Sequence, residues 1–184
     1  MKALGLKYRA VGAIALALRG IRAPTARFEG RPPILRISGR MAVGRNFSTR
    51  TLQFRSSIVV GTNGQFIVGD NVFINQGSTI WAEDSIEIGD RVLIGDLACI
   101  YDSGAHEVEP GRVVDTRPVT ISSDVWIGRN ALILPGVTIG RGSVVAAHSV
   151  VTKSIPEGVL VAGNPARVVR TFSVPDDFRR TVNN

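Results

Sequence analysis

The chain has 184 residues, 44% of them hydrophobic, which suits one domain with a substantial core and excludes a disordered tail. Its formal net charge is +7, but residues 1–60 contain twelve basic residues and a single acid, so the positive charge belongs to the N-terminal third. The single cysteine, Cys99, excludes an intramolecular disulfide framework and favours a cytoplasmic protein.

The basic N-terminal third suits an anionic partner, which could be a nucleic acid, a membrane surface or a polymer. It lacks the interleaved aromatic residues of single-strand binders and the motifs of proteins that read a duplex. We therefore expect no nucleic-acid partner.

The first predicted element is a short helix within a basic segment, residues 1–30, which contains the apolar run AVGAIALAL at 10–18. This run is too short to cross a bilayer, which needs about 20 residues. Arg19 and Arg22 follow it at once, without a small-x-small cleavage site, which argues against a signal peptide. Two roles stay open: the helix lies peripherally on an anionic inner membrane face, or it packs as a cap or subunit contact.

The next feature is a six-residue repeat, which predicts a solenoid over residues 31–170. A helix has a period of 3.6 and a simple strand a period of 2, so a strict period of six requires the chain to turn every six residues. Three such strands make one triangular coil of roughly eighteen residues, with aliphatic side chains inside and small residues at the corners. Glycine often follows the aliphatic residue. The repeating aliphatic positions are Val68, Ile74, Ile80, Ile88, Ile94, Ile100, Ile121, Ile127, Ile133, Ile139, Val145 and Val151.

The repeat stops at residues 104–118, which contain Gly104, Pro110 and Gly111. An insertion cannot stack on the neighbouring coils, so we expect a loop that projects outward. His106 lies at its start, and a neutral imidazole is suited to remove a proton from a hydroxyl group at pH 7. One of the nearby acids Asp102, Glu107 and Glu109 could orient this imidazole, and the sequence does not choose among them.

The segment 119–170 carries the motifs VWIG, ILPGVTIG, SVVTKSIP and AGNPARVV. In this combination it resembles the hexapeptide-repeat acetyltransferases, and it is most similar to the sugar O-acetyltransferase branch, which includes maltose, galactoside and exopolysaccharide acetyltransferases. The match extends over roughly residues 60–170. The resemblance implies a left-handed parallel β-helix, a homotrimer with active sites in the grooves between subunits, acetyl-CoA as acyl donor and no metal. Residues 171–184 are expected to form a tail or short helix.

The resemblance also implies roles for individual residues. It identifies His106 as the catalytic base, and Asn75 and Glu83 as the residues that hold the acceptor sugar. The chain departs from the maltose and galactoside type, because it lacks their His-Pro pair after the catalytic histidine and their N-terminal capping domain, which weakens the case for a mono- or disaccharide acceptor. The implied donor site has a flat wall, a small residue beside the pantetheine arm and cations for the phosphates, and comprises Trp126, Ala147, Thr152, Lys153, Arg167 and Arg170.

The sequence therefore predicts an O-acetyltransferase that modifies a sugar or polysaccharide in cell-envelope or exopolysaccharide synthesis, by direct transfer in a ternary complex. An N-acetyltransferase acting on an amino sugar and a noncatalytic scaffold remain as alternatives. A zinc-dependent carbonic anhydrase is disfavoured because the chain has only two histidines, His106 and His148. An acyl-cysteine intermediate is also disfavoured, because the repeat puts no base beside Cys99.

Overall fold

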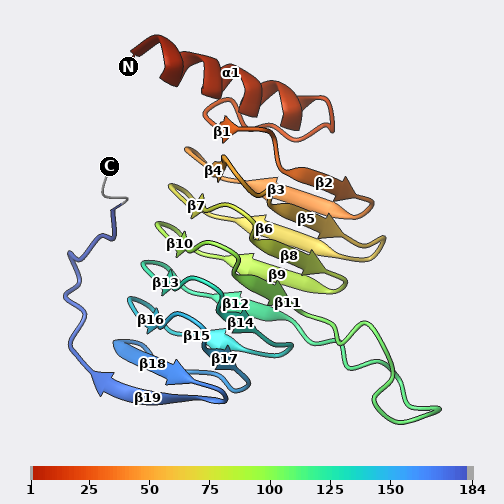
Figure 1. Cartoon of the computed structure of the whole chain (residues 1–184), viewed down its shortest axis with the longest axis vertical. Helices are drawn as coiled ribbons and strands as arrows, with labels where there is room; N and C mark the ends of the chain where they lie inside the picture. Colours follow the sequence, from red (N-terminus) through yellow and green to blue (C-terminus); the bar gives the residue numbers. More distant parts are fainter. Residues whose placement is uncertain (1, 182–184) are drawn as a thin grey trace.

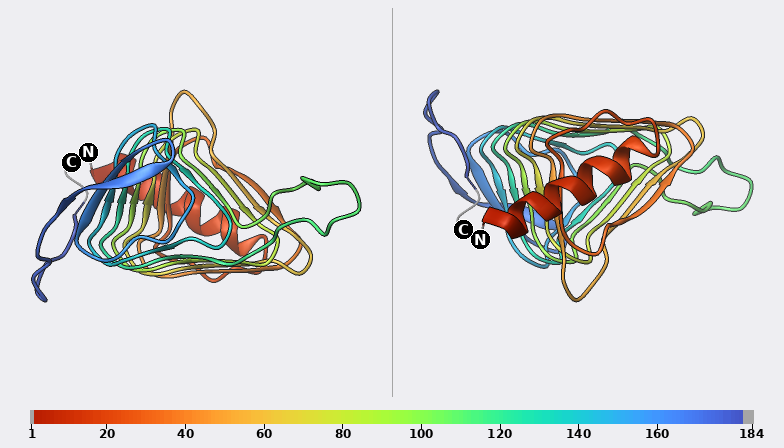
Figure 2. Two further views of the ribbon diagram at one scale, coloured as in Figure 1. Left: turned by 90° about the horizontal axis from the view of Figure 1, so that it is seen from below. Right: turned by 90° about the horizontal axis from the view of Figure 1, so that it is seen from above.

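The computed structural model describes residues 2–181, with the side chains of residues 7–181. It is a parallel β-helix of about six turns, covered at its N-terminal end by one helix, α1 (Lys2–Ala17) (Figure 1). Seen along its axis, the β-helix has a triangular outline whose sides are three sheets, here called sheets A, B and C (Figure 2). The expected parallel β-helix is confirmed.

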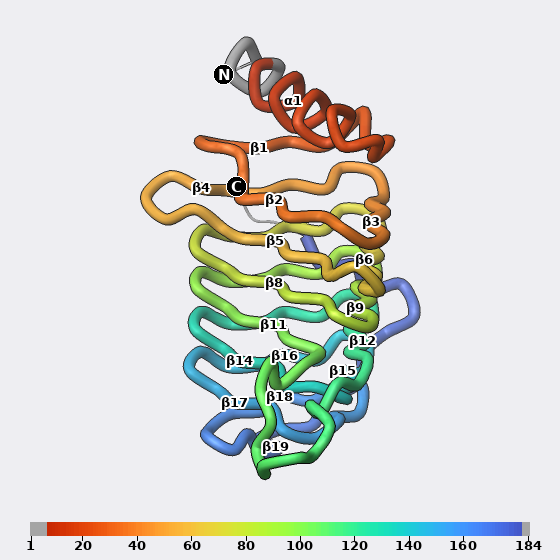
Figure 3. The backbone as a smooth tube through the Cα atoms, turned by 90° about the vertical axis from the view of Figure 1, so that its right-hand side faces the viewer, coloured from red at the N-terminus to blue at the C-terminus, as the bar shows by residue number. Residues whose placement is uncertain are grey.

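Sheet A contains β1 (Arg27–Gly30), β4 (Ser48–Thr51), β7 (Phe73–Ile74), β10 (Leu93–Ile94), β13 (Trp126–Ile127), β16 (Val144–Val145), β18 (Val159–Gly163) and β19 (Ala166–Thr171). Sheet B contains β2 (Ile34–Ile37), β5 (Ser57–Val60), β8 (Thr79–Ala82), β11 (Cys99–Tyr101), β14 (Leu132–Ile133) and β17 (Val150–Val151), stacked as Figure 3 shows. Sheet C contains β3 (Arg40–Val43), β6 (Gln65–Val68), β9 (Ser85–Ile88), β12 (Val119–Ile121) and β15 (Thr138–Ile139). All neighbours pair in parallel except β18 and β19, which are antiparallel.

The core is a set of side-chain ladders that run along the axis. In sheet A the register pairs Ile74 with Ile94, Ile94 with Ile127 and Ile127 with Val145. These four side chains are almost completely buried. Burying one such side chain contributes about 1.5–3 kcal/mol, so repetition of the same contact in each coil supplies much of the stability.

The corners are narrow, which explains the small residues of the repeat. Ser78, Ala98 and Ala131 are buried there. A Cβ atom on Gly128 would lie 2.6 Å from the amide nitrogen of Ala147 in the next coil, so a larger residue would push the coils apart. Asn71 adopts a left-handed conformation with φ of 59°, which asparagine tolerates better than most residues.

Helix α1 closes the N-terminal end of the core. Leu16 of this helix is fully buried, and the rings of Phe28 and Phe47 meet edge to face with centroids 6.3 Å apart. Strand β1 pairs with β4, so the first coil already begins at Arg27. No helix within residues 2–181 combines the length and apolar character needed to cross a membrane.

The C-terminal segment is a tail without helix in residues 172–181, and it runs back along the corner between sheets C and A towards α1 (Figure 1). The backbone N–H of Arg180 donates to the Asp124 carboxylate at 2.9 Å, and Arg141 donates to the carbonyl of Pro175 at 3.0 Å. Burial raises the pKa of the Asp124 carboxyl, but hydrogen bonds from Arg91 and Arg180 outweigh it, so its pKa is lowered overall. Asp124 therefore stays charged and holds the tail. Residues 182–184 lie outside the described part.

The inner ladder of sheet A has one polar member, Thr49, which pairs with Ile74. Its buried hydroxyl has no hydrogen-bond partner among the described residues. We expect Thr49→Val to raise the free energy of unfolding by about 1 kcal/mol in urea denaturation, because an unsatisfied polar group is replaced by a methyl group of similar shape.

Thr51 provides a matched control on the same face of β4. It is equally buried, but its hydroxyl donates to the carbonyl of Arg31. Thr51→Val should lower stability by about 1 kcal/mol. Changes of the same sign in both variants would contradict the explanation for Thr49.

Candidate active site

The interruption of the repeat forms a loop, residues 102–118, which leaves the corner between sheets B and C after β11 (Figure 3). Its base is fixed by an antiparallel bridge between Ser103 and Thr116, whose side-chain oxygens are 3.1 Å apart. The N–H of Gly104 also donates to the carbonyl of Asp115 at 2.9 Å. The start of the loop is therefore held in one geometry, while the remainder extends from the β-helix.

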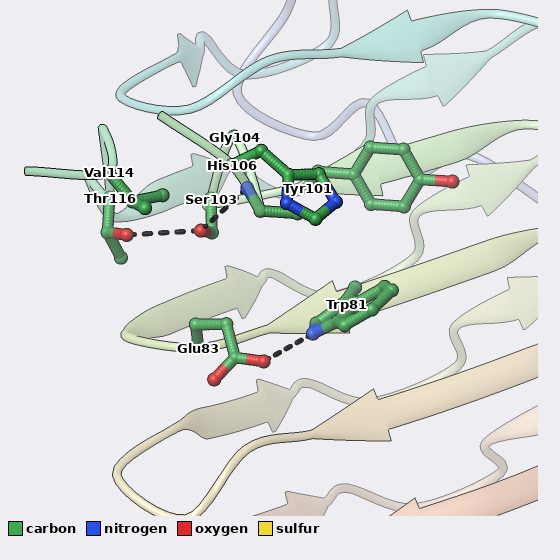
Figure 4. A pocket seen from close by; sticks show the side chains of 9 residues that line it. Trp81, Glu83, Tyr101, Ser103, Gly104, His106, Val114 and Thr116 are labelled. Carbon is green, nitrogen blue, oxygen red and sulfur yellow. Dashed lines mark hydrogen bonds between the residues drawn. The ribbon is translucent and has the colours of Figure 1, made fainter. Parts of the chain in front are cut away.

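A hollow of about 600 Å³ lies between this loop and the outer face of sheet B (Figure 4). His106 and Glu83 line it from successive coils. The imidazole makes no hydrogen bond to any described residue, so both ring nitrogens are open to a ligand. An imidazole with free nitrogens at an open hollow can accept a proton from a bound hydroxyl or amine. The lining consists of Trp81, Glu83, Tyr101, Ser103, Gly104, Ala105, His106, Val114 and Thr116.

Two aromatic residues, Trp81 and Tyr101, form one wall of the hollow and were not predicted. They pair across β8 and β11, and Trp81 donates its indole N–H to Glu83 at 2.5 Å, which fixes the carboxylate (Figure 4). Burial, followed by the neighbouring Cys99, raises the pKa of Tyr101 to about 12, so its hydroxyl keeps its proton at neutral pH. The repeat could have predicted this wall, because Trp81 and Tyr101 each follow an inward isoleucine and therefore face outward.

Asp102 is fully buried at the base of the loop and is not hydrogen-bonded to His106. Its two carboxylate oxygens accept the backbone N–H groups of Glu83 and Asp84, each at 2.8 Å. Burial raises the pKa of Asp102, although these hydrogen bonds oppose the increase. Asp102 therefore joins the start of the loop to the coil that carries Glu83.

The other two acids considered as partners for His106 are also engaged elsewhere. Glu107 accepts the N–H of Gly111 at 2.9 Å, and Glu109 pairs with Arg112 at 2.9 Å. No carboxylate within the described residues is hydrogen-bonded to the imidazole.

Asn75 does not line the hollow. It lies at the corner between sheets A and B, where its side-chain oxygen accepts the N–H of Gln76 at 3.0 Å. Sheet B therefore separates it from Glu83 and His106 within one chain.

The expected donor residues lie on the lower coils, outside the His106 hollow. Trp126 faces outward from β13 with 46% of its surface exposed, and Ala147 lies at the corner between sheets A and B. Thr152 and Lys153 follow β17, and Arg167 and Arg170 lie on β19, all exposed. Trp126, Arg167 and Arg170 thus belong to sheet A, whereas Lys153 lies after β17 at the corner between sheets B and C, so one chain does not bring all the expected donor residues together.

Comparisons with known proteins agree with this architecture. Residues 118–153 match the family model "Bacterial transferase hexapeptide (six repeats)", and residues 65–96 match "Hexapeptide repeat of succinyl-transferase". Among curated proteins, the putative lipopolysaccharide biosynthesis O-acetyl transferase WbbJ of Escherichia coli K12 is 32% identical over 154 residues, covering 77% of each chain.

Galactoside O-acetyltransferase of the same organism is 40% identical over 112 residues, which cover 59% of this chain and 55% of that protein. The chain thus spans little more than half the length of that relative. Among solved structures, the hexapeptide-repeat acetyltransferase VCA0836 of Vibrio cholerae, in complex with acetyl coenzyme A, superimposes with a TM-score of 0.60 at 27% identity, covering 94% of this chain and 89% of that chain.

The buried contact of Asp102 can be tested by mutation. Asp102→Ala leaves two backbone N–H groups without acceptors, and we expect the free energy of unfolding to fall by about 1–3 kcal/mol per N–H group. Urea denaturation measures the change. Asp115→Ala is the matched control, because this exposed loop acid pairs only with Arg117. Equal losses in the two variants would show that Asp102 does not join the loop to its neighbouring coil.

Proposed function

Because the chain belongs to the hexapeptide-repeat acetyltransferases, we propose that it transfers an acetyl group from acetyl-CoA to a sugar hydroxyl, with His106 as general base. The observation that carries the proposal is the open hollow that His106 lines together with Glu83 and an aromatic wall. The similarity to WbbJ favours a sugar of an envelope polysaccharide as acceptor.

The proposed role of His106 is to accept the proton of the acceptor hydroxyl as its oxygen attacks the acyl carbon. Bound acetyl-CoA supplies the acetyl thioester. Glu83, fixed by Trp81, hydrogen-bonds a second hydroxyl of the sugar and so orients the attacking oxygen. The Trp81 and Tyr101 side chains present a flat surface to the sugar ring. The acyl group then passes directly to the acceptor without a covalent enzyme intermediate.

The expected donor residues lie on different sides of one chain and outside the His106 hollow, which supports a homotrimer as the working unit. We assign the phosphates of acetyl-CoA to Lys153, Arg167 and Arg170, and its apolar arm to the surface near Trp126 and Ala147, with Thr152 as a further contact. In the proposed trimer, donor residues of one subunit adjoin the loop of the next. Asn75, which lies away from Glu83, would contribute to the acceptor site from the neighbouring subunit.

The exposed face of α1 supports peripheral attachment to an anionic membrane. Ile14 on α1 and Leu18 in the turn after it are 58% and 80% exposed, and Lys7, Arg19 and Arg22 flank them. Exposed apolar side chains beside basic residues are the features by which a helix lies in a membrane interface. The β-helix would then stand with its N-terminal end on the membrane, where a lipid-linked saccharide is available.

The catalytic proposal predicts that His106→Ala lowers acetyl transfer at least ~100-fold, because a general base contributes about 10²–10⁴ in rate. The measurement is release of coenzyme A, followed with a thiol reagent, with acetyl-CoA and a panel of neutral, acidic and amino sugars. Glu109→Gln, a change on the same loop away from the hollow, serves as control and should retain activity.

Transfer to a neutral sugar that survives in His106→Ala would contradict the assignment of the base. Transfer to an amino sugar alone, with little loss in the variant, would indicate an N-acetyltransferase, because an amine that is already neutral needs less help from a base.

The membrane proposal predicts that the wild-type protein floats with phosphatidylglycerol vesicles and that Ile14→Asp/Leu18→Asp does not, because the apolar face is lost and negative charge is added. Leu52→Asp, an exposed apolar residue on the β4 side of the β-helix, is the control. Flotation of the double variant at the wild-type level would reject α1 as the attachment site.

A further inference from the structure

A second hollow, of about 420 Å³, lies far from His106, at the corner between sheets C and A beneath α1. Four arginines from separate parts of the chain line it, and no acidic side chain does. Its volume lies within the range of about 300–1,000 Å³ that is typical of small-molecule sites. The lining consists of Arg9, Arg27, Asn46, Ser48, Asn71, Arg91, Arg180 and Thr181.

Two of these arginines are held in place by the fold. Arg91 donates to both oxygens of Asp124, at 2.7 and 3.1 Å. Arg180 donates to the carbonyl of Asp124 at 2.6 Å and to that of Gly142 at 3.1 Å. Their guanidinium groups are therefore positioned before any ligand arrives, which lowers the cost of ordering them on binding.

The other two arginines carry uncompensated charge. The guanidinium groups of Arg9 and Arg27 form no ion pair or hydrogen bond with a side chain of residues 7–181. Burial lowers the pKa of Arg180, and the attraction of Asp124 opposes this decrease. Neutral hydrogen-bonding groups complete the lining, since Asn46, Asn71, Ser48 and Thr181 have no charge of their own.

The docked C-terminal tail supplies part of the lining of the hollow. The tail brings Arg180 and Thr181 from the last coils to the level of the first ones, next to Arg9 of α1. Both views along the axis show the tail after β19 on one side of the β-helix and the His106 loop at the opposite corner (Figure 2). This site is therefore distinct from the proposed acetyl-transfer site and from the expected donor residues on the lower coils.

We propose that the four-arginine hollow binds a diphosphate group. A guanidinium fork matches the oxygens of a phosphate with two parallel hydrogen bonds, and several such forks suit an anion with more than one negative charge. Arg91 and Arg180 already have partners in the fold, so the two unpaired charges of Arg9 and Arg27 favour an anion with at least two negative charges over a single carboxylate. The diphosphate belongs either to a soluble nucleotide or to a lipid carrier, and the chemistry of recognition is the same for both.

The direct test is calorimetric titration of the full chain with inorganic pyrophosphate at fixed ionic strength. The Arg9→Gln/Arg27→Gln variant removes the two unpaired guanidinium groups without disturbing the contacts that hold the tail. It should bind pyrophosphate at least ~10-fold more weakly than the wild-type protein, because each lost partner is a charge-assisted hydrogen-bond donor.

The matched control is Arg36→Gln/Arg40→Gln, which makes the same charge change at two exposed arginines on β2 and β3, outside the hollow. It should bind pyrophosphate almost as well as the wild-type protein. Equal weakening in the two double variants would show a general charge effect and overturn the proposal, as would a lack of binding by the wild-type protein. This readout needs no acetyl transfer, so it does not depend on the proposed function.

Two further titrations identify the source of the diphosphate. Uridine diphosphate represents a soluble nucleotide, and phosphatidylcholine vesicles that contain a long-chain prenyl diphosphate represent a lipid carrier. Binding of either one that is lost in Arg9→Gln/Arg27→Gln and retained in the control supports the site and names its ligand class. Binding of either probe that is unaffected by the double variant counts against the hollow as its location.

Discussion

In-register stacking of the coils is the constraint on which the rest of this structure depends. Each inward side chain has the same kind of neighbour above and below, so an isoleucine ladder such as Ile74, Ile94 and Ile127 repeats one favourable contact along the axis. The same stacking forbids a side chain at Gly128 and forces any insertion outward. In-register stacking therefore explains both the regular core and the outward position of the insertion.

The chemistry that distinguishes this chain lies where the repeat is broken. The ladder buries its stabilising surface inside, so the outer faces and the loop are free to carry exposed polar groups at little cost to the fold. The loop brings His106 over Glu83 and the aromatic wall, and the tail brings Arg180 to the hollow beneath α1. Both the loop and the tail lie outside the repeat, and each contributes residues to a hollow on its outer surface.

Two buried aspartates join these irregular segments to the ladder, and their environments shift their pKa values in opposite directions. Asp102 has only backbone N–H groups as partners, and burial raises its pKa. Asp124 is contacted by guanidinium groups, and its pKa is lowered despite burial. A carboxylate compensated by positive charge holds the tail, whereas a carboxylate held by amides alone fixes the loop.

The sequence by itself determined the parallel β-helix, the inward positions of its aliphatic residues and the outward loop at His106, because a six-residue period is a local property that every coil repeats. The resemblance to the acetyltransferases also assigned Glu83 to the same acceptor site as His106. Only the tertiary structure decided that Asn75 lies at a different corner, that Trp81 and Tyr101 form the wall, and that Asp102 bonds to the neighbouring coil instead of to His106. The sequence likewise did not predict that the tail docks on Asp124, because Arg180 and Asp124 are 56 residues apart and no period relates them.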